Sequence, residues 1–225
     1  MWGGLGDPAC RYRLFPFAAF MAVLALRSLL PEQGAGGGDL RWLYALQAGL
    51  AGLLLALWWR EFTELASRPG VRDALLSVAV GLGVWWAWIR LDEPWMRMGT
   101  PDNAFNPVGP AGEVLWGLIA VRWLGATLVV PLMEELFWRS LLMRWIEAPD
   151  FMRVDPRRVG WRAIALSTFV FTLAHTEWLA AALAGLAYAL LYRHTGKLWT
   201  AVLAHAVTNG VLGAWVIVWG HWGYW

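Results

Sequence analysis

The chain has 225 residues, of which 59% are hydrophobic, and its 18 Lys and Arg against 16 Asp and Glu leave a formal net charge of +2. This composition excludes an ordinary soluble domain, which needs more polar surface, and so small a charge gives no sign of a nucleic-acid-binding protein. The single cysteine, Cys10, excludes an intramolecular disulfide and a thiolate metal cluster. We therefore expect an integral membrane protein whose surroundings are the lipid bilayer.

Apolar stretches recur along the chain, separated by segments rich in charge, Gly and Pro. In chain order they cover about 14–30, 40–59, 73–91, 113–143, 161–180, 178–193 and 198–219. Several approach the roughly 20 residues with which a helix crosses a bilayer, and many of the 19 tryptophans flank them, as in interfacial aromatic belts. The pattern predicts an all-α polytopic membrane protein of about seven transmembrane helices, forming a single integral membrane domain over residues 1–225. Only Thr176 and Glu177 separate the fifth and sixth helices.

The distribution of Lys and Arg over the connecting segments predicts the orientation in the membrane. With the N-terminus inside, the inner segments hold most of these residues, namely Arg11, Arg13, Arg60, Arg68, Arg72, Arg144, Arg153, Arg157, Arg158, Arg162, Arg193 and Lys197. The outer segments hold only Arg27, Arg41, Arg90 and Arg97. We therefore predict a multi-pass protein of the cell inner (plasma) membrane with a cytoplasmic N-terminus.

Several ionisable or amide side chains fall inside the predicted spans and not in the loops. They are Arg122, Glu134, Glu135, Arg139, His175, His205 and Asn209. A charge at mid-membrane costs about 2.5–3.5 kcal/mol on insertion scales, so such residues are usually paired and functional. Buried ion pairs that hold helices together are the structural alternative. We expect Arg122 either to snorkel or to pair with an acid on another helix, and we interpret Glu177 as a loop charge.

The spacing of these residues favours a catalytic cavity over simple ion pairs. Glu135 and Arg139 are four positions apart, so they share a helix face and can neutralise each other. Glu134 points about 100° away around the helix, which leaves its carboxylate without that partner and suited to activate a water molecule. His205 and Asn209 share a face in the same way on the last span. His175 lies on a third span, the one predicted at 161–180. The three spans are therefore expected to converge on one cavity within the membrane.

These residues also form three motifs that resemble a known family. Glu134-Glu135-Leu-Phe-Trp-Arg139, Phe171-Thr-Leu-Ala-His175 and His205-Ala-Val-Thr-Asn209 resemble the signature of the CAAX protease and bacteriocin-processing enzyme family, also called Abi proteins. The signature lies within a core of about 113–219. The overall size, the tryptophan content and the N-terminal spans also resemble the bacterial, exosortase-associated branch of CAAX-protease-related proteins.

The resemblance implies a glutamate-type intramembrane endopeptidase that cleaves a membrane-associated protein or peptide. In this reading Glu134 is the catalytic base, and His175 helps to hold and polarise the attacking water. His205 and Asn209 stabilise the oxyanion as uncharged donors. Many members have glycine where this chain has Ser140, a difference that removes no catalytic group.

The resemblance gives Glu135 and Arg139 a supporting role and implies no cofactor. A zinc-dependent intramembrane protease is the alternative, because two carboxylates and two histidines are suitable zinc ligands, although the chain has no His-Glu-x-x-His motif. Two further alternatives come from other classes: a non-catalytic membrane immunity or scaffold protein, and a transport protein. A transporter usually has internal repeats or broken helices, and the sequence shows neither.

Overall fold

The computed structural model describes residues 6–30, 39–98 and 105–225, and the fold is all-α. The principal helices are α1 (Pro8–Ser28), α2 (Leu43–Leu57), α3 (Val71–Trp88), a continuous helix over Trp116–Glu147, α7 (Trp161–Leu173), α8 (Trp178–Thr195) and α9 (Leu198–Trp219). Four of these segments are long and apolar enough to cross a membrane: Pro8–Ser28, Leu40–Leu57, Trp116–Glu147 and Leu198–Trp219. The prediction of an all-α polytopic membrane protein is confirmed.

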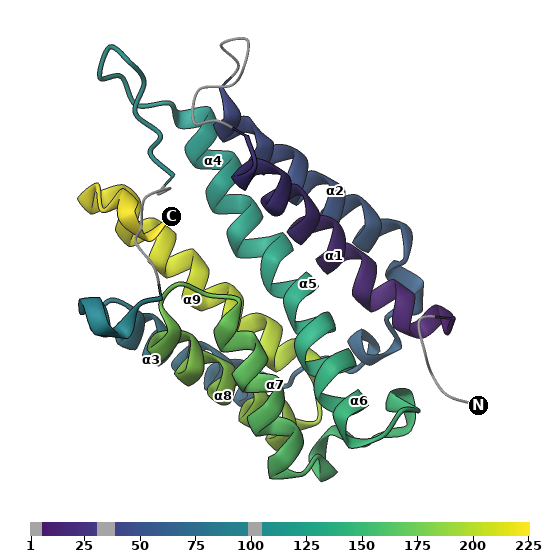
Figure 1. Ribbon diagram of the computed structural model, residues 1–225. Coiled ribbons are helices and arrows are strands. Elements are labelled where there is room, and N and C mark those ends of the chain that lie inside the picture. The colour runs from purple at the N-terminus through teal and green to yellow at the C-terminus, as the bar shows by residue number, and fades with distance from the viewer. Residues whose placement is uncertain (1–5, 31–38, 99–104) are drawn as a thin grey trace.

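The continuous helix lies between two groups of helices (Figure 1). On one side α1 and α2 form an antiparallel hairpin, and on the other α3 packs on α8 and α9 while α7 packs on α8. Small residues permit close approach, as is usual between membrane helices. A Cβ atom on Gly81 of α3 would lie 2.5 Å from the carbonyl oxygen of Ala204 on α9, and one on Gly125 would lie 2.8 Å from the Tyr44 ring on α2.

The continuous helix is not regular where it passes the centre of the fold. It consists of α4 (Trp116–Leu124), α5 (Val130–Glu135) and α6 (Arg144–Glu147), joined by π-helical turns over Gly125–Val129 and Leu136–Met143. The first π turn ends two positions before Pro131, which has no N–H to donate to an α-helical bond. Short π-helical turns are often found at functional sites. Here two of them flank α5, the segment that carries Glu134 and Glu135.

The predicted fifth span, 161–180, is wrong at its C-terminal end. Helix α7 stops at Leu173, and His175 lies in the connection to α8 and not inside a helix. At 1.5 Å per residue its 13 residues span about 20 Å, less than the roughly 30 Å of a bilayer core. The carbonyl of Phe171, which a continued helix would offer to the backbone N–H of His175, instead accepts from the imidazole Nδ1 at 2.8 Å. The N–H of His175 turns to Thr172.

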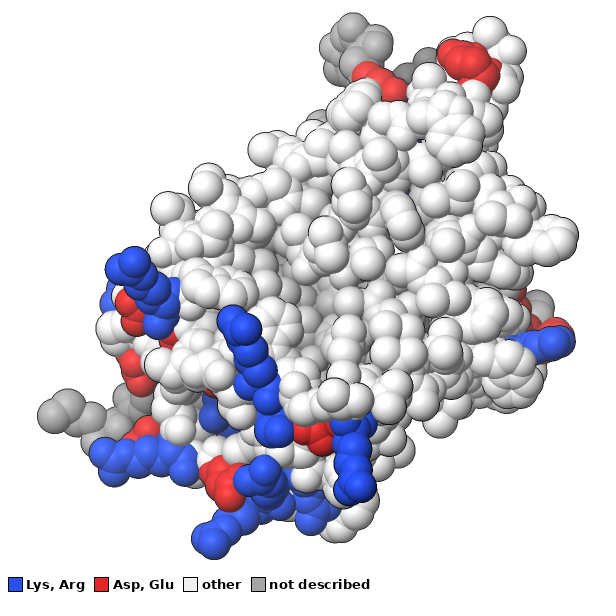
Figure 2. All heavy atoms as spheres, turned by 180° about the vertical axis from the view of Figure 1, so that it is seen from behind, with Lys and Arg blue, Asp and Glu red and all other residues white. Residues whose placement is uncertain are grey.

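The connecting segments meet at two opposite ends of the helices. At one end Arg13 contacts Glu64, Lys197 contacts Asp73 at 2.7 Å, and Arg157 donates to the carbonyl of Thr195. At the other end Arg41 donates to the carbonyls of Asn106 and Val108, and Tyr224 donates to Asp92 at 2.5 Å. Most of the visible Lys and Arg gather toward one end, beside a broad uncharged band (Figure 2). The division of Lys and Arg into inner and outer segments from the sequence corresponds to these two ends. Which side of the membrane each end faces stays a prediction.

The end that holds the N-terminal part of α1 contains a buried charge cluster. Arg13 contacts Glu64 at 2.5 Å, and the side chains are 0% and 7% exposed. Ser140 donates to the same carboxylate, and Arg144 lies 3.8 Å from it. Burial acts to raise the pKa of Glu64, but the hydrogen bonds and charge of Arg13 outweigh it and hold the pKa below its ordinary value. The cluster joins α1, the 63–66 turn and the continuous helix.

Candidate active site

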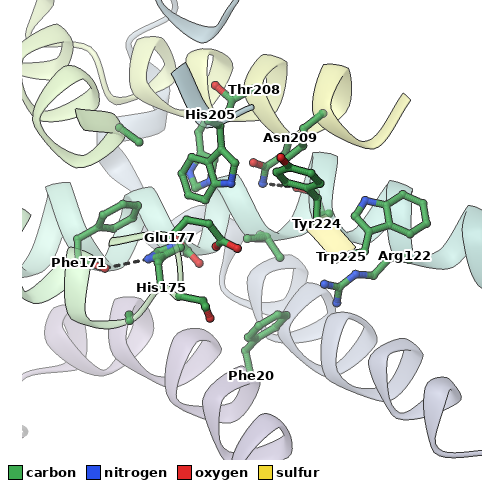
Figure 3. A pocket seen from close by; sticks show the side chains of 18 of the residues that line it. Phe20, Arg122, Phe171, His175, Glu177, His205, Thr208, Asn209, Tyr224 and Trp225 are labelled. Carbon is green, nitrogen blue, oxygen red and sulfur yellow. Dashed lines mark hydrogen bonds between the residues drawn. The ribbon is translucent and has the colours of Figure 1, made fainter. Parts of the chain in front are cut away.

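A cavity of about 540 Å³ lies between the α1–α2 hairpin and the helices on the other side of the continuous helix. Its walls come from α1, α2, α4, α5, the α7–α8 connection, α8, α9 and the 223–225 segment. Glu134, His175, His205 and Asn209 all line it. The structure therefore brings the four predicted catalytic residues to one cavity. Figure 3 shows His175, His205 and Asn209 around it.

Glu134 has the free carboxylate that the sequence predicts. Its Oε2 atom is buried and has no hydrogen-bond partner among the residues that the structure describes. The neighbouring carboxylate of Glu135 is not in the cavity lining and is fully buried on another side of the helix. The two adjacent glutamates therefore differ in surroundings, and only Glu134 faces space that a water molecule or substrate can enter.

Glu135 links two helices. The sequence predicted only its pairing with Arg139, which lies on the same helix. Its Oε2 lies 3.1 Å from Nε of Arg139, and its Oε1 accepts a 2.9 Å hydrogen bond from Nδ1 of His205. Arg139 also donates to the carbonyl of Gly185 at 3.1 Å, and its guanidinium lies 4.5 Å from the centre of the Phe171 ring. The supporting pair thus fixes the position of the cavity histidine on α9.

His205 is held on its ring face as well as at Nδ1. The Tyr188 ring stacks on it with a centroid distance of 5.0 Å, and the Tyr188 hydroxyl donates to Thr208 at 2.7 Å. Because Nδ1 donates to Glu135, a neutral His205 has its second ring nitrogen, Nε2, without a proton. Donation from Nε2 into the cavity therefore requires the imidazolium form, with Glu135 as counter-ion, so the expectation that His205 acts as an uncharged donor does not fit this geometry.

His175 is oriented by its own connection. A backbone carbonyl only accepts, so the 2.8 Å contact with Phe171 assigns the proton to Nδ1 and leaves Nε2 of a neutral ring as an acceptor. The ring packs against the Phe171 ring at 4.4 Å and edge-on to the Trp88 ring at 6.0 Å. Phe171 and His175, the first and last residues of the second motif, are therefore in contact, although a regular helix does not bring them together.

Asn209 is anchored to the irregular part of the continuous helix. Its side-chain Nδ2 donates to the carbonyl of Ala126 at 2.9 Å, and Ala126 belongs to the first π turn. One of the two amide hydrogens stays available for the cavity. The π turn therefore positions α5 and also provides the acceptor that orients Asn209.

Two charged cavity residues, Glu177 and Arg122, were not assigned to the site from the sequence. Glu177 was interpreted as a loop charge, and it does lie in the α7–α8 connection, but it also lines the cavity. Arg122 pairs with no acid among the described residues; its guanidinium lies 4.3 Å from the centre of the Tyr44 ring. The signal for Arg122 was present, since an arginine inside a predicted span is a functional candidate.

The residues that the structure describes include no group of three or more His, Cys, Asp and Glu arranged so as to hold a metal ion. Of the zinc ligands considered from the sequence, Glu135 and His205 bond to each other, and Glu135 is also paired with Arg139. Glu135 does not line the cavity, so it is not placed to bind a metal there, whereas Nε2 of His205 remains free beside the Nδ1 bond.

Residues 116–211 match the family model described as type II CAAX prenyl endopeptidase Rce1-like. The matched segment begins with α4, ends within α9, and contains all six residues assigned to the site from the sequence. No curated protein and no solved structure gives a significant match.

Proposed function

We propose, from the premise that residues 116–211 place this chain in the CAAX protease family, that it is a glutamate-type endopeptidase with its active site inside the membrane. The family is one of proteases, and the apolar helices make this a membrane protein. Its substrate is then a membrane-associated protein or peptide. An exosortase-associated role and residence in the inner membrane with a cytoplasmic N-terminus belong to the same proposal.

One observation carries the mechanism: Oε2 of Glu134 has no hydrogen-bond partner within residues 6–30, 39–98 and 105–225, in a cavity that also contains an imidazole acceptor. A water molecule between them donates one hydrogen to Glu134 and the other to Nε2 of His175. Its lone pair is then directed at the scissile carbonyl carbon. Glu134 takes the proton as the new carbon–oxygen bond forms, which is general base catalysis.

Attack converts the carbonyl oxygen into an oxyanion, which needs donors on the other wall of the cavity. Asn209 has one amide hydrogen available, and a protonated His205 provides a second donor from Nε2. Glu135 balances the charge of that imidazolium at 2.9 Å. Glu134 then returns its proton to the leaving nitrogen, the carbon–nitrogen bond breaks, and the carboxylate is restored.

The decisive experiment is cleavage of a membrane-associated peptide by purified protein in lipid nanodiscs. Glu134→Gln should abolish turnover and leave the protein folded, because the amide cannot accept the water proton. Glu61→Gln is the matched control, since Glu61 is exposed and lies outside the cavity. Turnover by the Glu134 variant at the wild-type rate would refute the proposal.

The mechanism needs no metal, and a zinc protease is its alternative. Wild-type protein should retain its activity after dialysis against a chelator, and the purified protein should hold less than one zinc per chain. Activity lost to the chelator and restored by zinc would replace the proposed mechanism with the metal-dependent one. A scaffold or transport function predicts no cleavage by any of these preparations.

A further inference from the structure

A second pocket lies at the end of the helices where most of the Lys and Arg visible in Figure 2 gather. It has a volume of about 500 Å³, and its walls come from the Pro156–Arg158 turn, the start of α7 and the last turns of α8. Its lining residues are Arg157, Trp161, Leu190, Arg193 and His194. None of them lines the cavity of the candidate active site, which lies beyond the other end of α7.

The two arginines of this pocket lack a counter-ion. Neither Arg157 nor Arg193 forms an ion pair with an acidic side chain among the residues that the structure describes. Lys197, a few positions after Arg193, differs because it contacts Asp73 at 2.7 Å. Asp155 accepts from the backbone N–H of Arg157 at 3.0 Å and not from its side chain. The pocket therefore presents positive charge that the described part of the chain does not balance.

Arg157 is held in place by the end of α8. Its guanidinium donates to the carbonyl of Thr195 at 2.8 Å. It also packs on Gly196, where a Cβ atom would lie 2.8 Å from Cζ of Arg157. Gly196 ends α8 with a φ of +69°, a conformation that glycine adopts without strain. The bond to Thr195 uses one of the five guanidinium N–H groups, so the group is fixed in position with donors left for an anion.

Arg193 and His194 provide the other donors of the pocket. Cζ of Arg193 lies 5.0 Å from the centre of the Trp161 ring, a contact that covers one face of the guanidinium and leaves its N–H edge available. His194 adds an imidazole, which has a donor N–H in either tautomer. The start of α7 takes no part, because Glu147 accepts from the backbone N–H of Gly160 at 2.9 Å. The donors are thus side chains on a fixed framework.

The pocket adjoins an exposed apolar surface of α7 and α8, which pack side by side (Figure 1). Trp161 and Phe169 share one face of α7, since they are eight positions apart, and both are exposed. Leu186 and Leu190 are four positions apart on α8, and Leu186 is exposed as well. A tryptophan between charged residues and an apolar helix face is typical of the membrane interface. Headgroup chemistry and acyl-chain chemistry therefore meet at this pocket.

We propose that the pocket binds the phosphate of an anionic phospholipid, whose acyl chains lie along the exposed apolar surface of α7 and α8. Arg157, Arg193 and His194 donate to the phosphate oxygens, and a guanidinium matches a phosphate with two parallel hydrogen bonds. The unbalanced positive charge repels headgroups that carry their own cation, such as choline. The lipid joins the start of α7 to the end of α8, and this binding does not depend on the proposed catalysis.

The test compares two lipids that have the same acyl chains. Full-length protein in a neutral detergent receives an equimolar mixture of phosphatidylglycerol and phosphatidylcholine, and the retained lipid is identified by native mass spectrometry. Phosphatidylglycerol should be retained at least about tenfold over phosphatidylcholine. The melting temperature should also be higher in nanodiscs that contain phosphatidylglycerol than in pure phosphatidylcholine, because a ligand of the folded state stabilises it.

Variants distinguish the pocket from a general effect of positive charge. Arg193→Gln and Arg157→Gln should each lower the preference for phosphatidylglycerol about fivefold, and the double variant should remove it. Arg157→Gln also loses the bond to Thr195, so its folding is checked by the melting temperature in phosphatidylcholine, whereas Arg193→Gln loses no hydrogen bond to the described residues. Arg153→Gln is the matched control, because Arg153 is exposed in the same connection outside the pocket, and it should retain lipid like the wild type.

Three results would overturn the proposal. They are equal retention of the two lipids, a preference that persists in the double variant, and an equal loss in Arg153→Gln, which would show general attraction to this end of the protein. A water-soluble phosphate ester is the other source of the same chemistry, and glycerol 1-phosphate at millimolar concentration tests it. If it stabilises the wild type in phosphatidylcholine nanodiscs as much as phosphatidylglycerol does, but not Arg193→Gln, the pocket belongs to a soluble ligand and not to a lipid.

Discussion

The Oε1 atom of Glu135 accepts a 2.9 Å hydrogen bond from Nδ1 of His205, which lies seventy positions later in the chain. The contact joins the first and last sequence motifs and couples the Arg139 ion pair to the cavity. A residue that does not line the cavity thereby fixes the orientation of one that does.

This coupling predicts the behaviour of Glu135→Gln. The variant should lower kcat about tenfold or more, because the amide no longer balances an imidazolium at His205, and should also lower the melting temperature, because Arg139 loses its anion in a dry interior. The Glu135→Gln/His205→Ala double variant should be less damaging than the product of the single effects. Enzyme kinetics in nanodiscs measure kcat, and thermal unfolding in nanodiscs measures the melting temperature. Independent, multiplicative losses would show that the two residues do not act as one unit.

Asn209→Ala should lower kcat by about 10² to 10³, the loss seen when one oxyanion donor is removed from a serine protease, with little change in KM. Asn209→Ala also loses the hydrogen bond to the carbonyl of Ala126, which could lower stability. Thermal unfolding in nanodiscs is therefore measured for the same variant, to separate a loss of stability from a loss of kcat. A normal kcat with a raised KM would assign Asn209 to substrate binding instead.

The predicted orientation places the 144–162 loop, which contains the 148–160 connection between α6 and α7, on the cytoplasmic side. Single cysteines at Arg153, whose side chain is 88% exposed, and at Glu113, which is exposed at the opposite end, report the two sides in a Cys10→Ser background. A membrane-impermeant thiol reagent added to intact cells should label Glu113→Cys and spare Arg153→Cys. The reverse pattern would invert the topology.

The Arg13–Glu64 cluster predicts that the stability of the folded protein decreases at acid pH. The pKa of Glu64 is lowered in the folded state, so its contribution is complete above the ordinary glutamate pKa of about 4.3 and is lost as the pH falls through the lower folded value. Glu64→Gln should lower the melting temperature at pH 7 and flatten its acid dependence. Glu61→Gln, in the same segment but exposed, is the control. Equal acid dependence in Glu64→Gln and wild type would contradict this assignment.

Hydropathy and spacing predicted most of the helices, and the last predicted span coincides with α9 at 198–219. Helix α7 was extended too far because Ala174 continues the apolar run, while in the structure the Phe171 carbonyl accepts from the backbone N–H of Ala174 and from the His175 imidazole. Composition does not reveal such competition for a carbonyl.

The candidate site was predicted as a set of residues, since all four proposed catalytic side chains line one cavity. Their pairing was predicted only within a helix, as for Glu135 and Arg139, where four-residue spacing fixes the neighbours. The partner of His205 and the empty environment of Arg122 depend on how distant helices pack. The π turns that orient α5 and Asn209 likewise leave no simple trace beyond Pro131.

The shortness of α7 has a consequence for the supply of the second reactant, water. Because the helix stops after 13 residues, residues 174–177 form irregular backbone, which lipid tolerates only where it is buried in protein or lines a cavity. All four of these residues line the cavity, and the carbonyl of Thr176 accepts from the backbone N–H of Met98. The end of α7 therefore makes one wall of the cavity from polar backbone, which is the surrounding that a hydrolytic water would need under the proposed function.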